Sequence, residues 1–456
     1  IDTFQDAKEY GSILTVKEAN YDGLLDYIEE IQQHGANDLA VSAWIGEIAD
    51  RIPTLIKQAK IMSEKYDVCV TNPPYLSSMT VYLNNYVKKS YPDSKSDLYA
   101  VFIERCSSFI KQNGFQSMIT QHSWMFLSAY ERLRNKTQEK TILSMAHLGP
   151  RAFEEIAGEV VQTTVFVLTK EKINHYKGKY ERLLNANSQE AKEKLFLSEK
   201  NIYITDAENF IKIPGNPIAY WVGNSVFKAF NDCRSISDYG EAKAGMTTGD
   251  NNRFLRLWYE IKITDIGFHI ENSKLAIKSQ KTWFPYNKGG GYKKWYGLNE
   301  YVVFWKNNGE AIKSATRNGK KIASVRSERL YFKESITWAT LTSGPISCRY
   351  SETGHLFDDK GSSCFVSKKY IKIFLAYINS KVGNYFLNIL NPTMSYQSGN
   401  IAALPIKINN ISIDALNSII NKNIDIAIIC TPKEYAQQSA DLLVSFGIKA
   451  IWNFAP

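Results

Sequence analysis

The stretch YDVCVTNPPY, residues 66–75, is the part of this 456-residue chain from which the fold can be worked out. Val68 and Val70 flank Cys69 in a short run of β-forming residues, and the run stops at two prolines. Proline has no backbone N–H and therefore cannot continue a central strand. We predict a buried strand that ends in a stiff, extended loop at Asn72.

Strand and helix signals alternate beyond this loop. The expected elements are a helix over residues 97–111, a strand over 115–120, a helix over 126–137, a strand over 142–148 and a hairpin-like strand within 160–169. Such alternation is typical of a mostly parallel α/β sheet. Ligands of these sheets bind at the carboxyl ends of the strands, which is where the NPPY loop falls.

The regions on either side differ in character. Residues 21–62 carry helical periodicity, which Pro53 interrupts. Residues 171–212 are rich in Lys, Glu, Asn and Gln, a composition typical of a solvated connector. Residues 213–406 are rich in Trp, Tyr, Gly and Lys and indicate a mixed α+β domain. Residues 407–456 close with a strand, a helix and a strand, which predict one small β-α-β unit.

The composition fits a folded protein with a nucleic-acid partner. Lys and Arg number 55 against 46 Asp and Glu, a formal net charge of +9, which suits nucleic acid but also many enzymes. The six cysteines show no CxxC pair, so we expect no zinc site, no disulfides and a reducing, cytoplasmic setting. We find no leader and no apolar run long enough for a bilayer, and we expect that the start at Ile1 reflects an N-terminal truncation.

Asn72, Pro73, Pro74 and Tyr75 form the sharpest chemical signal. The exocyclic amino group of adenine is a poor nucleophile, and two acceptors for its N–H bonds would stabilise the charge that develops during alkylation. The Asn72 amide oxygen and the Pro73 carbonyl can supply them, while Tyr75 can stack on a base flipped out of the duplex. The alternative is an ordinary strand-ending turn, since Asn-Pro-Pro is common turn chemistry.

Two further stretches carry a resemblance to a known family. SDLYAVFIERCSSFIKQNGFQSMITQHSWMFLSAYERLR (residues 96–134) and GEVVQTTVFVLTK (158–170) resemble the adenine-specific DNA methyltransferases, specifically the PglX family of bacterial BREX phage-defence systems. The resemblance implies a partial Rossmann-like methyltransferase sheet over residues 1–170, with the target adenine held by residues 72–75. It also implies S-adenosylmethionine as the methyl donor and phage defence as the setting, with other defence proteins as candidate partners.

The same resemblance assigns roles near this loop. It implies that Asp97 and Tyr99 lie on the cofactor side and that Trp124 and Phe126 line the base pocket. From the residues alone, Asp97 is equally well a helix N-cap, and the two aromatic residues are equally well core.

The second half matches the same family. The matching stretches are GMTTGDNNRFLRLWYE (245–260), WFPYNKGGGYKKWYG (283–297), YFKESITWATLTSG (331–344) and NPTMSYQSGNIAALPI (391–406), which implies a target-recognition domain on double-stranded DNA over residues 213–406. Glycine backbone can approach phosphates closely, and lysines and aromatic rings stand beside it. The candidate DNA-binding residues are Arg253, Arg256, Lys288, Gly289, Gly290, Tyr292, Lys293, Lys294 and Trp295. A glycine-rich turn with solvated lysines, and arginines paired with acids such as Asp250, is the alternative.

Two features depart from that family. No glycine-rich loop precedes Asn72, and the lone Gly11 cannot pass under a methionine moiety as such a loop does. Cofactor binding by this chain is therefore in question, and a catalytically inactive DNA-binding module is the competing hypothesis. The other departure is the tail, which resembles a fragment of the Rex redox-sensing repressors through residues 424–430, Thr431, Pro432, Gln437, Gly447 and 453–456. Because no GxGxxG precedes this tail, we do not expect it to bind NAD, and no residue set predicts a metal.

Overall fold

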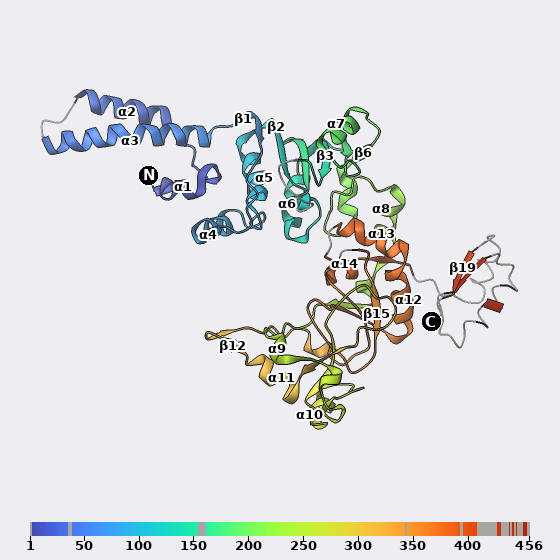
Figure 1. The fold of residues 1–456 in the computed structure, drawn as a ribbon. Coiled ribbons are helices and arrows are strands. Elements are labelled where there is room, and N and C mark those ends of the chain that lie inside the picture. Colours follow the sequence, from blue (N-terminus) through green and yellow to red (C-terminus); the bar gives the residue numbers. More distant parts are fainter. Residues whose placement is uncertain are drawn as a thin grey trace. The chain divides into compact units, whose positions relative to one another are not determined.

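The computed structural model describes residues 2–34, 39–153, 161–342, 344–392, 395–407, 426–429 and 450–453, together with Gln437, Ala440, Asp441 and Val444. The chain divides into two compact units, Ile1–Phe227 and Lys228–Pro456, and each is described by itself (Figure 1). Among the residues described, no helix combines the length and the apolar character needed to span a membrane.

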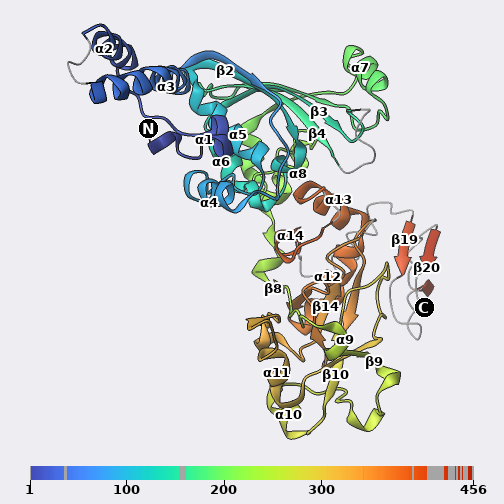
Figure 2. The same ribbon diagram turned by 60° about the vertical axis from the view of Figure 1, so that its left-hand side comes forward.

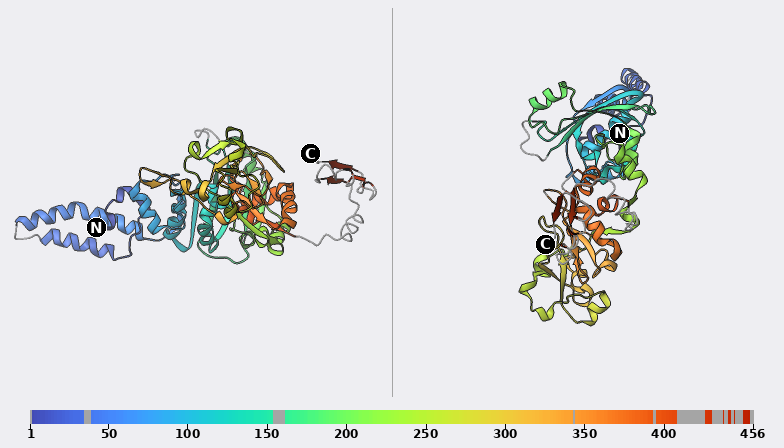
Figure 3. Two further views of the ribbon diagram at one scale, coloured as in Figure 1. Left: turned by 90° about the horizontal axis from the view of Figure 1, so that it is seen from below. Right: turned by 90° about the vertical axis from the view of Figure 1, so that its right-hand side faces the viewer.

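The first unit begins with helices and continues as a sheet. Its main elements are α1 (Ala7–Tyr10), α2 (Tyr21–His34), α3 (Leu39–Ser63), β1 (Tyr66–Thr71), α4 (Val81–Ser90), α5 (Leu98–Phe109), β2 (Ile110–Gln121), α6 (Glu131–Gln138), β3 (Thr141–Gly149), β4 (Thr163–Thr169), β5 (Lys177–Arg182), α7 (Gln189–Leu197) and β6 (Ile202–Asp206). Helix α8 (Asn224–Asp232) includes the division between the two units. Helices α2 and α3 lie side by side (Figure 3). Pro53 lies inside α3, so the predicted interruption is wrong.

The sheet of the first unit is mixed. Its strand order is β1-β2-β4-β3-β5-β6, in which β1 pairs with β2 and β3 with β5 in parallel. The other three neighbouring pairs are antiparallel. The predicted α/β class is confirmed, but the expectation of a mostly parallel sheet is wrong. The physical reason is that β4 folds back against β3 and inserts between β3 and β2, so it runs against both neighbours.

Helices α5 and α6 cover one face of this sheet (Figure 2). Side chains alternate between faces along a strand, and in β2 the buried Gln116, Met118 and Thr120 alternate with more exposed neighbours. Met118 packs with Trp124 and Phe166 in the core. One face of the sheet therefore carries the hydrophobic core, and the other is more open.

Strand β1 is the edge of the sheet and not the buried strand that we expected. Val68 and Val70 are 54% and 71% exposed, while Cys69 between them packs against the core. The apolar residues 68–70 indicated a buried strand, but only Cys69 points toward the core. Residues 171–212 also differ from the predicted connector, because β5 and β6 join the sheet and Tyr180 of β5 is fully buried.

The second unit is an α+β structure, as predicted. Its main elements are β7 (Arg234–Ser235), β8 (Gly240–Lys243), α9 (Asn251–Phe254), β9 (Leu255–Leu257), α10 (Ser273–Lys278), β10 (Trp283–Asn287), β11 (Tyr301–Phe304), α11 (Lys306–Lys313), β12 (Thr316–Arg317), β13 (Lys320–Lys321), β14 (Ser335–Trp338), β15 (Cys348–Ser351), β16 (Leu356–Phe357), β17 (Ser363–Val366), α12 (Lys368–Asn379), α13 (Lys381–Leu390), α14 (Ser398–Ala402) and β18 (Pro405–Ile406). Two four-stranded sheets, β16-β10-β11-β9 and β15-β14-β17-β8, form its centre.

The tail contains two described strands, β19 (Ile426–Ile429) and β20 (Ala450–Asn453), which pair in parallel. Gln437, Ala440, Asp441 and Val444 between them are helical, in agreement with the predicted β-α-β unit. Most of the residues that carry the likeness to Rex, including Thr431, Pro432 and Gly447, lie outside the described residues.

Candidate functional site

The NPPY loop leaves the carboxyl end of β1 with its polar groups open. Asn72 is exposed, Pro73 is buried and Pro74 is exposed. In the part of the chain that the structure describes, no hydrogen bond reaches the Asn72 side chain or the Pro73 carbonyl. The loop therefore presents an amide that is free to meet a ligand, and its first proline fixes the backbone against the protein.

Tyr75 is the last residue of the NPPY loop and packs against the core. Its ring packs edge-on against Tyr99, with centroids 5.9 Å apart and planes at 81°. Its hydroxyl is buried and has no hydrogen-bond partner among the described residues. Burial raises the pKa of Tyr75 to about 12. The ring is thus held by packing on one side, and its hydroxyl stays protonated at neutral pH.

Asp97 ties the loop to the helix that follows. One carboxylate oxygen accepts from the backbone N–H of Leu76 at 2.9 Å and from that of Tyr99 at 3.3 Å. Asp97 is the N-cap of α5, and Leu98 donates its N–H back to the Leu76 carbonyl at 3.1 Å. Burial raises the pKa of Asp97, while these backbone N–H groups oppose the rise. The N-cap alternative is thus the role that the structure gives this residue.

The aromatic residues expected around a base pocket are core residues. Trp124 is fully buried and donates its indole N–H to Thr120 Oγ1 at 3.1 Å, and Phe126 is 3% exposed. Tyr99 is also fully buried, and its hydroxyl lies 2.7 Å from Ser123 Oγ. Tyr99 packs against Tyr75 of the NPPY loop, and all three residues belong to the core and do not form an open wall beside the loop.

Sequence reasoning missed a buried histidine pair next to this support. His122 Nδ1 lies 2.8 Å from His147 Nε2, and His147 Nδ1 lies 3.1 Å from the Tyr220 hydroxyl. Burial lowers the pKa of His122 to about 4 and that of His147 well below its ordinary value. Both rings are therefore neutral at pH 7. The two histidines are 25 residues apart, so no sequence spacing could have revealed the pair.

One surface cluster has the residue types of a metal site. His175, Asp206 and Glu208 each place a possible ligand atom within 4.8 Å of the others. The His175 Nδ1 atom is 3.5 Å from Asp206 and 3.3 Å from Glu208, and His175 is 82% exposed. Asp206 also accepts the Glu208 backbone N–H, as an N-cap does. The three side chains form a loose cluster around the largely exposed His175.

In the second unit, the glycine loop adopts the backbone that only glycine tolerates. Gly289 and Gly290 have φ of +99° and +116°. A Cβ at Gly289 would lie 2.8 Å from the Lys360 carbonyl. Gly290 is exposed, so the loop brings uncovered backbone to the surface.

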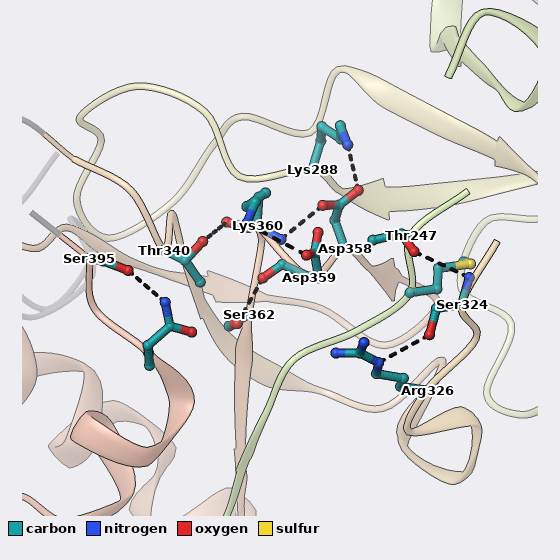
Figure 4. Close-up of polar contacts among 12 residues, drawn as sticks. Thr247, Lys288, Ser324, Arg326, Thr340, Asp358, Asp359, Lys360, Ser362 and Ser395 are labelled. Atoms are coloured by element: carbon teal, nitrogen blue, oxygen red, sulfur yellow. Dashed lines mark hydrogen bonds and ion pairs between the residues drawn. The ribbon is translucent and has the colours of Figure 1, made fainter. Parts of the chain in front are cut away.

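The basic residues around this loop separate into two groups. Tyr292 and Lys293 are exposed, whereas Lys294 donates to the Asn379 carbonyl at 2.9 Å. Lys288 lies 2.5 Å from the carboxylate of Asp358, which is 1% exposed (Figure 4). Lys293 is therefore the lysine of this loop that is available to a phosphate.

Trp295 of the same loop is half-buried. Its backbone forms a bridge with β15, with its N–H donating to the Cys348 carbonyl. It anchors the loop to the sheet.

The two candidate arginines have different surroundings. Arg253 is exposed, and Asp250 accepts its backbone N–H and makes no ion pair with its guanidinium. Arg256 Nη1 donates to the carbonyls of Asn252 and Leu255 at 2.6 and 2.7 Å. An open cavity of about 460 Å³ brings Arg256 together with Lys288; its lining residues are Asn251, Asn252, Leu255, Arg256, Leu257, Glu260, Lys288 and Tyr301.

Two family descriptions match parts of the chain. Residues 11–153 match the Eco57I restriction-modification methylase, a range that includes the NPPY loop and Asp97. Residues 398–456 match the CoA binding domain. Over 38 residues the chain is also 66% identical to the redox-sensing transcriptional repressor Rex of Caldanaerobacter subterraneus subsp. tengcongensis, which is 8% of this chain and 17% of that repressor.

Two longer relatives cover most of the chain. It is 42% identical over 418 residues to the adenine-specific methyltransferase PglX of Lacticaseibacillus casei (strain Zhang), which is 88% of this chain and 34% of the relative. It is 36% identical over 418 residues to the adenine-specific methyltransferase BrxX of Escherichia coli O9:H4 (strain HS), which is 89% of this chain and 33% of the relative. The chain spans about a third of the length of these curated relatives. The resemblance predicted from the motifs is thereby confirmed, and the chain is similar over nearly nine-tenths of its length to one part of the adenine-specific methyltransferases PglX and BrxX.

Proposed function

We propose that residues 66–168 form the target-base side of a site-specific DNA methyltransferase that modifies adenine N6. The observation that carries this proposal is the open Asn72 amide at the carboxyl end of β1, beside the buried Pro73 and the fixed ring of Tyr75.

The chemistry follows from the electron demand of the reaction. The adenine amino group must turn from planar to tetrahedral as its nitrogen forms a new bond, and positive charge develops on it. The Asn72 oxygen would accept one N–H and the Pro73 carbonyl the other, so both would stabilise that charge. Tyr75 would stack on the extruded base, and this contact would offset part of the free energy needed to unstack the base from the duplex.

S-adenosylmethionine is the methyl donor that the relatives' names imply, and the two residues expected on its side, Asp97 and Tyr99, do not fit it. Asp97 is 7% exposed and uses its carboxylate on backbone N–H groups, and the Tyr99 hydroxyl is engaged with Ser123. Neither residue offers a free polar atom to a cofactor. Their proposed role is therefore to position the NPPY loop.

The second unit is the proposed reader of double-stranded DNA. Arg253, Tyr292 and Lys293 expose their side chains, and Gly290 exposes its backbone, which suits contact with phosphates. Arg256 lines an open cavity, but the other basic residue of that cavity, Lys288, is paired with the buried Asp358 and is not counted among the proposed DNA contacts. We propose that this activity serves BREX phage defence, which is the setting implied by the resemblance to the PglX family; the similarity to relatives named PglX and BrxX supports it.

The test compares Asn72→Ala with Asn85→Ala, a change of an exposed asparagine on α4. Methyl transfer from labelled S-adenosylmethionine to duplex DNA would be measured for both variants and for the unaltered chain. We expect the Asn72 variant to lose roughly 10²- to 10³-fold in rate with unchanged DNA affinity, as for loss of one preorganised transition-state contact. Asn85→Ala should behave like the unaltered protein. A rate within a few-fold for Asn72→Ala removes the proposed mechanism.

A DNA-binding module without transferase activity is the second candidate. In the described residues ahead of β1 we find the helices α1, α2 and α3 and no glycine-rich turn from a strand into a helix. Calorimetry with S-adenosylmethionine, together with a DNA shift assay on the same 456-residue chain, separates the two. DNA binding without cofactor binding assigns this chain to the second candidate.

A further inference from the structure

Two thiols of the first unit meet where α5 covers the edge of the sheet. Cys69 is the inward-facing residue of β1, and α5 packs against this strand. Cys106 of α5 is 3% exposed and belongs to the core cluster against which Cys69 packs. The two side chains form a thiol–thiol hydrogen bond. Their sulfur atoms are therefore in contact, although the two residues lie far apart in the sequence.

The surroundings of the two thiols differ. Cys69 is half-buried, whereas Cys106 is buried. The hydrogen bond from the Cys106 thiol lowers the pKa of Cys69 to about 7, and burial opposes this change. The same hydrogen bond, together with burial, raises the pKa of Cys106. At neutral pH, Cys69 therefore carries a large thiolate fraction and is the sulfur that a solute can reach, while Cys106 keeps its proton.

The other described cysteines have different environments. Cys348 and Cys364 are buried, and burial raises the pKa of both thiols. Cys233 is half-buried, like Cys69, and belongs to the second unit. Oxidation selects cysteines that combine thiolate character with access to solvent, and such a cysteine often has a second thiol beside it. Among the described cysteines, Cys69 combines partial exposure, a lowered pKa and a contacting thiol.

We propose that Cys69 and Cys106 form a site of reversible oxidation, which takes a hydroperoxide such as hydrogen peroxide as its oxidant and ends in a disulfide. The Cys69 thiolate attacks one peroxide oxygen, the O–O bond breaks, and the leaving hydroxide takes up a proton from solvent, so Cys69 becomes a sulfenic acid. The Cys106 sulfur then attacks the Cys69 sulfur, the S–O bond breaks, and the Cys106 proton leaves with the hydroxide as water. Two thiols and one hydrogen peroxide thus give one disulfide and two waters.

The proposed disulfide joins the two elements that flank the NPPY loop. Strand β1 leads into Asn72, and the N-cap of α5 is Asp97, whose carboxylate already holds the loop. Free thiols in the structure agree with a reversible bond, because thiol–disulfide exchange with small thiols returns such a bond to the reduced form. The oxidation would act beside the proposed base site, but the thiol chemistry does not rest on the proposed function.

The test treats the native 456-residue chain with hydrogen peroxide at pH 7, blocks the remaining thiols with iodoacetamide and maps tryptic peptides without reductant. Cleavage after lysine and arginine places Cys69 in peptide 66–88 and Cys106 in peptide 106–111. We expect these two peptides to be linked, and dithiothreitol to restore both thiols. The link should form at least about tenfold faster than in the chain unfolded in urea, because unfolding lowers the Cys69 thiolate fraction from about half to about 3% and separates the thiols.

Three variants assign the roles of the two thiols. Cys69→Ser should abolish the link and leave the buried Cys106 unoxidised. Cys106→Ala should also abolish it, and Cys69 should then react with iodoacetamide at pH 7 at least about tenfold more slowly, because the donor that lowers its pKa is gone. Cys233→Ser is the matched control, since it changes another half-buried cysteine, and the link should form as in the unaltered chain. Cys69→Ser keeps the test informative if Cys106→Ala does not fold.

Three results would overturn the proposal. The first is native chain in which peroxide does not link peptides 66–88 and 106–111. The second is a link that forms no faster in the native chain than in urea, which would show that the fold does not bring the thiols together. The third is equal alkylation of Cys69 in Cys106→Ala and in the unaltered chain, which would show that the Cys106 thiol does not activate Cys69.

Discussion

Asp97→Ala is the change that should most directly release the NPPY loop. The carboxylate accepts the backbone N–H groups of Leu76 and Tyr99, and it is too buried for water to replace it fully. A hydrogen bond to a charged group contributes about 1.5–3 kcal/mol, so we expect local opening at Leu76 to become easier by that amount. This corresponds to roughly ten- to 150-fold faster exchange of the Leu76 amide hydrogen.

The assay is native-state hydrogen exchange, because a chain of two units need not unfold in one step. Asp97→Asn keeps an acceptor and removes the charge that burial disfavours, so it should stay within about 1 kcal/mol of the unaltered protein. Ser188→Ala removes the N-cap of α7 and serves as a control that should leave Leu76 unchanged. Two results would contradict this prediction: equally fast exchange of the Leu76 amide in Asp97→Ala and in the unaltered protein, or equally fast exchange in Asp97→Asn and in Asp97→Ala. Either would show that the charged hydrogen bond of Asp97 does not hold the NPPY loop.

Three further outcomes are expected. His122 has a folded pKa of about 4 against about 6.5 when unfolded, so its stabilising contribution is present above pH 6.5 and falls as the pH drops. By pH 5 His122 alone should cost the first unit about 2 kcal/mol and His147 should add to this loss, so His122→Gln should remove only part of the pH dependence. Lys288→Met should destabilise the second unit by about 3 kcal/mol in denaturant titration, because the buried Asp358 loses its cation, and Lys288→Met with Asp358→Asn should recover most of the loss. Pro53→Ala should stabilise α3 by about 1–3 kcal/mol, seen as slower amide exchange in that helix, whereas a decrease would mean that Pro53 is needed for a bend.

The order of strands and helices could be predicted from residue patterns, but the direction of the strands could not. Periodicity depends on which side chains are buried, and β4 has the same pattern whether it runs with or against its neighbours. Direction is set by the return of β4 against β3, which places β4 between β3 and β2. The predicted interruption at Pro53 was wrong for a related reason. Proline destabilises a helix by a limited amount, and the packing of α3 against α2 offsets that destabilisation.

The sequence could indicate a candidate site only where the residues of the site are consecutive. Asn72 and Tyr75 sit in one short string after a strand, and the open amide is where that string indicated. The pairing of His122 with His147 and the exposure of β1 depend on contacts between distant segments. Arg349 is only 1% exposed, and nothing in a single sequence distinguishes such an arginine from a solvated one.

The stability of the NPPY loop and its proposed chemistry reside in different groups. Packing of Pro73 and Tyr75 and the tether at Asp97 hold the loop, and none of these contacts uses the Asn72 amide. A rigid acceptor needs no reorganisation when charge develops on its partner, and this is the condition under which a neutral amide can stabilise a transition state. Asn72→Ala should therefore leave the Leu76 amide as protected as before while it removes methyl transfer, and Asp97→Ala should loosen the loop and slow transfer together. A variant of Asn72 that also loosened Leu76 would show that the amide stabilises the fold, and the division of roles would be wrong.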